Sequence, residues 1–319
     1  MMIRRLLVAL TATMAILGAH PVQAATLQSF MTDCASDDDD VALVGCTGII
    51  NSGIAPPEVL AQAYDNRGLA YDGKGQYDLA IADYSQAIKY NPKDSAAYAG
   101  RADAYQAKKA YDLALADYSK AIELDPRDAL AYTNRGGTYD QLGQYDRAIS
   151  DETTAIGIMP SLAEAYVNRS AAHRHKGEVE QALVDISTAI GLEPSLAEAY
   201  QSRADIYYEK REYDLAIADY SRAIDLKPQY ATAYIGRGNA YDQNGQRDLA
   251  IADYSKAIEA APDSTDGYLS RAAAYWRGGD PRSAIADLKV VLKLDPSLTY
   301  VQTMLDLCQK EADAKAVHP

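Results

Sequence analysis

Arginine recurs along this chain at a constant interval. Seven arginines are equally spaced, namely Arg67, Arg101, Arg135, Arg169, Arg203, Arg237 and Arg271. A sequence with such a period builds one supersecondary unit repeatedly, and each unit completes its core only against its neighbours. With the first unit beginning at Ala61, repeats 1 to 7 begin at residues 61, 95, 129, 163, 197, 231 and 265, and the last ends at residue 298.

Four other positions of the repeat are constant or nearly so. They are a tyrosine at position 4 (Tyr64 to Tyr268), a small residue at position 8 (Gly68 to Ala272), an alanine at position 20 (Ala80 to Ala284) and a proline at position 32 (Pro92 to Pro296). Positions 4, 8 and 11, the last mostly aromatic, share one face of a helix because they follow i, i+4, i+7 spacing. This pattern predicts the first helix of each repeat.

A second helix is predicted after a turn. Most repeats carry glycine at the turn and aspartate at the third position after it, where the N-terminus of a helix favours a carboxylate. These residues are Gly75, Gly143, Gly177, Gly245 and Gly279, and Asp78, Asp112, Asp146, Asp214 and Asp248. The small and apolar stripe of the second helix is Ala80, Tyr84 and Ala87 in repeat 1, and the closing proline ends this helix.

The small, aromatic, alanine and proline positions resemble those of the tetratricopeptide repeat family over residues 61 to 298. The resemblance implies an all-α, right-handed α-solenoid of seven helix-turn-helix repeats, whose first helices line a concave groove. The chain departs from the family pattern at a few positions, which leave the fold secure and suggest a modified middle of the array. These are Glu152 and Ile186 in place of the second-helix tyrosine, His173 in place of the first-helix aromatic residue, and Leu288 and Val291 in repeat 7.

Both ends of the array are expected to be capped. Residues 42 to 50 align with residues 80 to 88, which places Cys46 under Tyr84 and predicts a degenerate half-repeat within an N-terminal helical cap, residues 25 to 60. Residues 299 to 319 are expected to form a C-terminal capping helix and tail, with polar residues on the face that ends the core in water.

The N-terminal segment, residues 1 to 24, has the pattern of a signal peptide. Arg4 and Arg5 precede an apolar run from Leu6 to Gly18, and small residues stand before a cleavage point near Ala24. A retained anchor is the weaker interpretation, because the run is shorter than the ~20 residues that span a bilayer. We expect an exported protein, periplasmic or secreted, without an integral membrane span.

The cysteines are consistent with an oxidising compartment. Cys34 and Cys46 are close enough in sequence to form a disulfide that staples the N-terminal cap. Cys308 is then left over, and its place on an apolar helical stripe predicts a buried thiol.

Charge and composition exclude several functions. Cleavage of the signal would change the net charge from −14 to −16, which disfavours nucleic acid and anionic membrane surfaces as partners. No catalytic constellation or nucleotide loop is present, so no enzyme activity and no cofactor are predicted. His173 and His175 point to different sides of a helix and cannot share a metal, and residues 37 to 40, all aspartate, lack the spacing of a calcium loop.

The recurrent arginine, at position 7, has a matching aspartate at position 23 of every repeat. The seven partners are Asp83, Asp117, Asp151, Asp185, Asp219, Asp253 and Asp287. We interpret each pair as a semi-buried ion pair between the two helices of one repeat, since a planar guanidinium can fix a carboxylate in orientation. The competing interpretation is a column of cations that binds phosphates or acidic peptides, which the matched aspartates oppose.

The resemblance places positions 2, 5, 6, 9, 12 and 13 on the groove. There the chain carries mainly acidic and amide side chains, namely Asp65, Asp72, Asp103, Asp140, Glu164, Glu198, Asp205, Asp242 and Asp266, with Gln106, Gln141 and Gln243. Asn66, Asn134 and Asn168 at position 6 are similar to a partial asparagine ladder, in which amides bind a peptide backbone. The alternative is that these asparagines cap or solvate their helices.

These features predict a scaffold that binds a neutral or basic segment of another envelope protein in its groove. Tyr208 and Trp276 favour repeats 4 to 7 as the binding half, together with Asp242, because groove aromatics are common interface hot spots. Alternatively, both rings pack against the next repeat. A polysaccharide-binding or peptidoglycan-associated module is the rival function, and it needs the same two aromatics exposed.

Overall fold

The computed structural model describes residues 21–317 as a series of helices with no strand between them. The expected signal peptide therefore lies largely outside the described residues. The helices are α2 (Pro21–Cys34), α3 (Asp39–Asn51), α4 (Pro57–Gly73), α5 (Tyr77–Tyr90), α6 (Ser95–Ala107), α7 (Tyr111–Leu124), α8 (Ala129–Gln141), α9 (Tyr145–Ile158), α10 (Ala163–His175), α11 (Val179–Leu192), α12 (Ala197–Glu209), α13 (Tyr213–Leu226), α14 (Ala231–Gln243), α15 (Arg247–Ala260), α16 (Thr265–Arg277), α17 (Pro281–Leu294) and α18 (Thr299–Val317).

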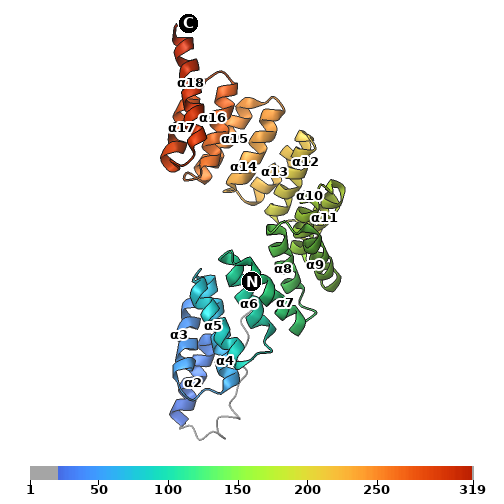
Figure 1. Ribbon diagram of the computed structural model, residues 1–319, viewed down its shortest axis with the longest axis vertical. Coiled ribbons are helices and arrows are strands. Elements are labelled where there is room, and N and C mark those ends of the chain that lie inside the picture. Colours follow the sequence, from blue (N-terminus) through green and yellow to red (C-terminus); the bar gives the residue numbers. More distant parts are fainter. Residues whose placement is uncertain (1–20, 318–319) are drawn as a thin grey trace. The chain divides into compact units, whose positions relative to one another are not determined.

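The chain forms two compact units, which meet in sequence between Pro160 and Ser161. In the first unit, the hairpin α2–α3 is followed by the hairpins of repeats 1 to 3, α4–α5, α6–α7 and α8–α9. The second unit contains the hairpins of repeats 4 to 7, from α10–α11 to α16–α17, and ends with α18 (Figure 1). Within each unit, successive hairpins pack on one another and the first helices of neighbouring repeats are in contact. We call the surface of these first helices at positions 9, 12 and 13 the first-helix face.

The turn inside each of the seven repeats has a residue with a left-handed backbone at position 15. Gly75 has φ +70°, and the amide of Gln76 donates to the Tyr71 carbonyl across the turn at 2.8 Å. Glycine adopts this conformation without strain, which explains its recurrence at position 15. Lys109 and Arg211 take the same conformation at φ 59° and 62°, so two turns form without glycine.

The core consists of alanine stripes and second-helix tyrosines. Ala80, Tyr84 and Ala87 are buried in α5, as expected. The Tyr84 ring lies against two glycines: a Cβ added to Gly68 would meet the ring at 3.0 Å, and one added to Gly100 in the next repeat would meet it at 2.6 Å. Tyr84 thus packs between its own first helix and that of the following repeat, at two positions where a methyl group would crowd the ring.

The N-terminal cap contains a helix that the repeat pattern did not identify. The alignment of residues 42 to 50 predicted one helix, whereas α2 and α3 form a complete helical hairpin that packs on α4. The helix α2 lacks the repeat signature, so periodicity could not reveal it. The aspartate run starts α3, where the Asp38 carboxylate accepts hydrogen bonds from the amides of Asp40 and Val41.

The C-terminal helix α18 covers the last hairpin. Val301, Cys308 and Ala312 are buried on the side that packs on α17, and Cys308 is a free thiol with no exposed surface. None of the described helices combines the length and the apolar character that crossing a bilayer requires.

Candidate functional site

The recurrent arginines belong to the frame of the fold. In each repeat, Nε and one terminal nitrogen of the guanidinium donate to the two carboxylate oxygens of the matching aspartate, at 2.6–2.9 Å. The guanidinium also lies 5.5–6.0 Å from the centre of the position 4 tyrosine ring of the same repeat. In Arg67 and Arg237, for example, the hydrogen bond to aspartate raises the already high pKa of the guanidinium, so the side chain stays charged.

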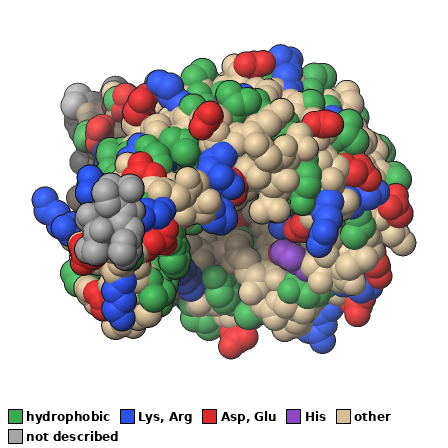
Figure 2. Space-filling model, turned by 90° about the horizontal axis from the view of Figure 1, so that it is seen from above, with side chains coloured by type: hydrophobic (Ala, Val, Ile, Leu, Met, Phe, Trp, Pro, Cys, Tyr) green, Lys and Arg blue, Asp and Glu red, His purple; other side chains and the backbone are tan. Residues whose placement is uncertain are grey.

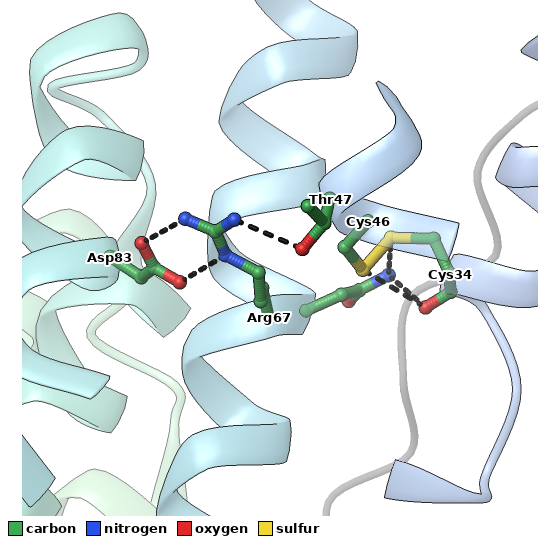
Figure 3. The surroundings of a disulfide bond; sticks show 6 residues. Cys34, Cys46, Thr47, Arg67 and Asp83 are labelled. Carbon is green, nitrogen blue, oxygen red and sulfur yellow. Dashed lines mark hydrogen bonds and ion pairs between the residues drawn. A yellow bond between two sulfur atoms is a disulfide. The ribbon is translucent and has the colours of Figure 1, made fainter. Parts of the chain in front are cut away.

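The remaining guanidinium nitrogen binds the preceding hairpin, a contact that the sequence interpretation missed. Arg101 donates to Ser85 Oγ at 3.0 Å, and Arg237 donates to Ser221 Oγ at 3.0 Å. Arg67 does the same with Thr47 of α3 at 3.1 Å (Figure 3). The sequence does carry a recurring serine or threonine at position 25 of most repeats. Its role as the acceptor of this hydrogen bond could not be predicted, because the bond depends on how one hairpin packs on the next. Within each unit, these arginines therefore join neighbouring hairpins as well as the two helices of one repeat.

A disulfide and an asparagine connect the cap to repeat 1. Cys34 and Cys46 form a disulfide between α2 and α3, beside the contact of Arg67 with Thr47 (Figure 3). The Asn66 amide donates to the Cys34 carbonyl at 3.3 Å, and Asn66 is only 1% exposed. Asn66 was expected to bind a partner, but in the structure its side chain is buried and its amide is hydrogen-bonded to the cap.

The first-helix face of unit 1 carries a cluster of polar groups around Asp103. The carboxylate of Asp103 accepts hydrogen bonds from the Tyr118 hydroxyl at 2.5 Å and the Asn134 amide at 2.9 Å. The Tyr118 hydroxyl also lies 2.8 Å from Gln106 Oε1. Burial raises the pKa of Asp103 to about 6, and the nearby charge of Asp72 acts in the same direction. We call Asp72, Asp103, Gln106, Tyr118 and Asn134 the Asp103 cluster.

Asp72 is the unusual member of this cluster. Its Oδ1 atom is buried and has no hydrogen-bond partner among the described residues, and burial raises its pKa. A carboxylate oxygen withdrawn from water without a donor is unfavourable, so this arrangement requires an explanation.

Repeats 4 and 5 contain an equivalent cluster in which one negative side chain is replaced by a positive one. Asp205 stands at the position of Asp103 and accepts a hydrogen bond from the Tyr220 hydroxyl at 2.5 Å. At the position of Asp72, repeat 4 has Arg174, whose guanidinium lies 3.6 Å from Asp205 and 3.6 Å from Glu209. The second unit thus supplies its own cation to the aspartate–tyrosine pair.

Asp242, an expected binding residue, is also neutralised within the second unit. Its side chain is 6% exposed and lies 2.5 Å from the Arg277 guanidinium and 3.4 Å from Nε of Arg247. Tyr208 is half-buried in the same region, and its ring lies 5.7 Å from that of Tyr213.

The Trp276 side chain packs on the C-terminal helix α18 and is hydrogen-bonded to it. Its indole nitrogen donates to Glu311 of α18 at 2.7 Å, and the ring packs on the cluster that contains Val301 and Cys308. The Trp276 ring therefore packs against the next element of the chain, as the alternative interpretation of the sequence predicted. Asn134 belongs to the Asp103 cluster, and Asn168 is half-buried in α10. Asn66 and Asn134, both at position 6 of unit 1, thus have different hydrogen-bond partners.

His173 leaves an open pocket where other repeats have an aromatic ring. The pocket has a volume of about 430 Å³ and is lined by Arg169, His173, Glu180, Gln181, Val184 and Asp185. Nδ1 of His173 lies 2.6 Å from Glu178, and Nε2 lies 3.8 Å from Asp185. The imidazole therefore connects α10 with the start of α11 inside one repeat, which is a structural role.

Charges of both signs are spread over the face shown in Figure 2. On the face in Figure 2, acidic and basic side chains alternate with apolar and uncharged groups and do not form a large patch of one sign.

Family models confirm the nature of the repeats. A tetratricopeptide repeat model matches residues 66–129, others match residues 118–150 and 231–264, and a model described as TPR repeat matches residues 204–245. The chain is a tetratricopeptide repeat protein. No curated protein matches it significantly in sequence.

Solved structures with the same fold are distant in sequence from this tetratricopeptide repeat protein. A chain of the APC/C hetero-tetramer Cut9–Hcn1 is 17% identical with a TM-score of 0.64; the match covers 94% of this chain and 59% of that one. A tetratricopeptide repeat protein from Parabacteroides merdae is 18% identical with a TM-score of 0.62, covering 78% and 98% of the two chains. PilF of Pseudomonas aeruginosa is 22% identical with a TM-score of 0.59, covering 68% and 99%. These likenesses confirm the all-α solenoid of about seven repeats.

Proposed function

We propose that this tetratricopeptide repeat protein is an exported scaffold that binds a segment of another envelope protein on its first-helix face. The observation that carries the proposal is the contrast between frame and face. Frame positions hold mostly the same residues from repeat to repeat, whereas positions 9, 12 and 13 vary from small and apolar residues to carboxylate, amide, tyrosine and arginine side chains. A constant frame with a varied face is suited to display, and tetratricopeptide arrays serve mostly as scaffolds without catalysis.

Export is supported by two independent features. The N-terminal segment, residues 1 to 24, has the pattern of a cleaved signal, and the cap contains the Cys34–Cys46 disulfide. Disulfides persist mainly in oxidising compartments such as the periplasm or the cell exterior. The partner is then a protein of the same compartment.

Site-specific crosslinking tests this function. A photoreactive residue at Ala107 or Gln141, exposed at position 13, should capture a polypeptide in the native envelope, and mass spectrometry should identify it. The matched positions are Leu113 and Leu215, which are 52% and 49% exposed near the start of second helices. Capture only from the second-helix positions, or none from any position, would refute binding through the first-helix face.

A polysaccharide-binding module of the envelope is the second candidate, and Tyr208 is the residue that favours it. Sugar rings bind to exposed aromatic faces, but Trp276 is packed on α18, which leaves Tyr208 without its expected companion. Sedimentation with purified peptidoglycan tests this candidate. Binding that Tyr208→Ala abolishes would support it against the protein scaffold.

A further inference from the structure

We propose that Asp72 and Asp103 receive the guanidinium of an arginine in the bound polypeptide. This inference rests on the proposed scaffold function and specifies the chemistry of the partner at one site. It moves the main charged contact to repeats 1 and 2, whereas the sequence had favoured repeats 4 to 7.

The protein itself supplies the template for this site. In repeats 4 and 5, a guanidinium from position 12 of one repeat lies against the aspartate–tyrosine pair of the next, as Arg174 does with Asp205 and Tyr220. In repeats 1 and 2, the same pair exists as Asp103 and Tyr118, but position 12 of the preceding repeat is Asp72. The aspartate–tyrosine pair is kept, while the cation is replaced by a second carboxylate.

The hydrogen bonds around Asp103 leave this charge uncompensated. Its described partners, Tyr118 and Asn134, are neutral donors, and Oδ1 of Asp72 is buried without a partner among the described residues. Positions 2, 5, 6, 9, 12 and 13 of repeats 1 to 3 contain no lysine, arginine or histidine. The second unit places Arg174, His175 and Arg277 at these positions. Two carboxylates close together without a cation form an incomplete site.

An arginine fits better than a lysine for a geometric reason. A guanidinium is planar and has donors on several edges, so it can serve Asp72 and Asp103 at once, as Arg174 lies near both Asp205 and Glu209. A hydrogen bond to a charged group contributes more than a neutral one, and the contribution grows when the groups leave water.

The test uses two capped pentapeptides with the full chain, one with a central arginine among alanines and one with citrulline in its place. Citrulline keeps the shape of arginine but is neutral. Binding is followed by the NMR shifts of backbone amides in α4 and α6. We expect the arginine peptide to bind at least about tenfold more tightly, as loss of a charged hydrogen-bonded contact implies. Equal affinity of the two peptides would overturn the proposal.

Variants of the chain locate the site. Asp72→Asn and Asp103→Asn should each weaken binding of the arginine peptide about tenfold. Asp205→Asn is the matched control, because its carboxylate already faces Arg174, and it should leave binding unchanged. Asp72→Arg should abolish binding by placing the chain's own guanidinium at the site. Unchanged binding by Asp72→Asn, in a variant with wild-type thermal stability, would refute the site.

A gain of binding provides a test that loss of folding cannot imitate. Arg174→Asp recreates in repeats 4 and 5 the arrangement of repeats 1 and 2, and it should add a second site for the arginine peptide, seen in the amides of α10 and α12. Folded Arg174→Asp protein without this second site would contradict the proposal.

Two further experiments distinguish a polypeptide from a small guanidinium ligand, and the arginine contact from the scaffold function. If N-acetylarginine amide binds as tightly as the arginine peptide, the site recognises a small guanidinium ligand and gains nothing from the polypeptide. That result would overturn the inference. If crosslinking from Ala107 captures the same polypeptide equally with Asp72→Arg, the arginine contact is wrong while the scaffold function stands. If no polypeptide is captured at all, the scaffold function itself fails.

Discussion

At the scale of the residue, one arginine side chain makes three kinds of contact, and repeat 6 shows all of them. Arg237 binds both oxygens of Asp253, donates to Ser221 of the preceding repeat, and lies over the Tyr234 ring. The side chains of Arg237 and Asp253 are 19% and 8% exposed, so the pair is largely removed from water. A partly buried pair of this kind is costly to break from one side, because the remaining charge lacks compensation.

Asp253→Ala should therefore destabilise the protein by about 3 kcal/mol, whereas Ser221→Ala should cost about 1 kcal/mol because it removes one hydrogen bond. Replacing both Arg237 and Asp253 by apolar residues should recover part of the loss. Urea unfolding measures these differences. The matched control is Glu259→Ala in the same helix, whose exposed pair with Lys256 should contribute less than about 0.5 kcal/mol. Equal losses at the buried and exposed pairs would contradict the frame role.

Asp103 makes the stability of unit 1 depend on pH. In the folded chain its pKa is about 6, whereas an aspartate in an unfolded chain titrates near 4. Between these values only the folded chain holds the proton, so the contribution of this group to stability is present at low pH and is lost as pH rises through 6. From pH 7 to pH 5, Asp103 should add about 1 kcal/mol to the unfolding free energy.

The difference between wild type and Asp103→Asn isolates this contribution, because the other carboxylates are common to both. Unfolding free energies at pH 5 and pH 7 give the comparison, and carboxyl NMR shifts give the pKa directly. Asp72→Asn should lower the pKa of Asp103 by removing a neighbouring negative charge. A pKa near 4 in the wild type would show that the carboxylate is more hydrated than its burial indicates.

At the scale of the element, the first helix of a repeat comes closest to the preceding hairpin where it carries a glycine. Gly100 in α6 and Gly236 in α14 stand at position 6, each against the tyrosine ring of the preceding repeat, and an added Cβ would lie 2.6 Å and 2.4 Å from that ring. Position 6 thus faces the preceding hairpin. This explains why Asn66, also at position 6, reaches Cys34 rather than a ligand.

Gly100→Ala should destabilise the protein by about 1 to 3 kcal/mol, because overpacking against Tyr84 outweighs the better helix propensity of alanine. Gly157→Ala is the control, since a Cβ there meets nothing within 4 Å and alanine should stabilise by about 0.5 kcal/mol. Thermal unfolding measures both changes. Stabilisation by both substitutions would mean that the helices can separate to admit a methyl group.

The disulfide connects the two helices of the cap. Replacing Cys34 and Cys46 together by alanine should destabilise the cap by roughly 3 kcal/mol in the chain-entropy model, since the bond closes a loop of about a dozen residues. Thiol titration of denatured, unreduced protein should find one reactive group per chain, Cys308. Three reactive thiols in protein isolated from the envelope would show that the bond does not form there.

At the scale of the whole molecule, the sequence predicted what lies within a repeat better than what lies between repeats. Equivalent positions of successive repeats identified the helix pairs and the partner of Arg67, because both depend on geometry inside one hairpin. The bond of Arg67 to Thr47 and the burial of Asn66 depend on how a hairpin seats on its neighbour, which periodicity does not specify. The Asp103 cluster became visible only when Asp72 could be compared in space with Arg174.

Each compact unit should fold by itself. The stability of a repeat array is a sum of contributions from each repeat and its nearest neighbours, and each unit contains several complete junctions. We expect fragments 21–160 and 161–319 to be helical and to unfold cooperatively, as circular dichroism during heating would show. A fragment that remains unfolded alone, while the full chain is stable, would show that the units depend on each other.

The hydroxyl that each arginine reaches has a consequence for the history of the chain. Within each unit, one rule joins neighbours: the guanidinium of one repeat meets position 25 of the repeat before it. Joining the end of one repeat to the start of another therefore recreates the same junction. Recombination between the repeated stretches of the gene could shorten or lengthen the protein in steps of one whole repeat at little cost, whereas the insertion of a single residue inside a helix would break the rule.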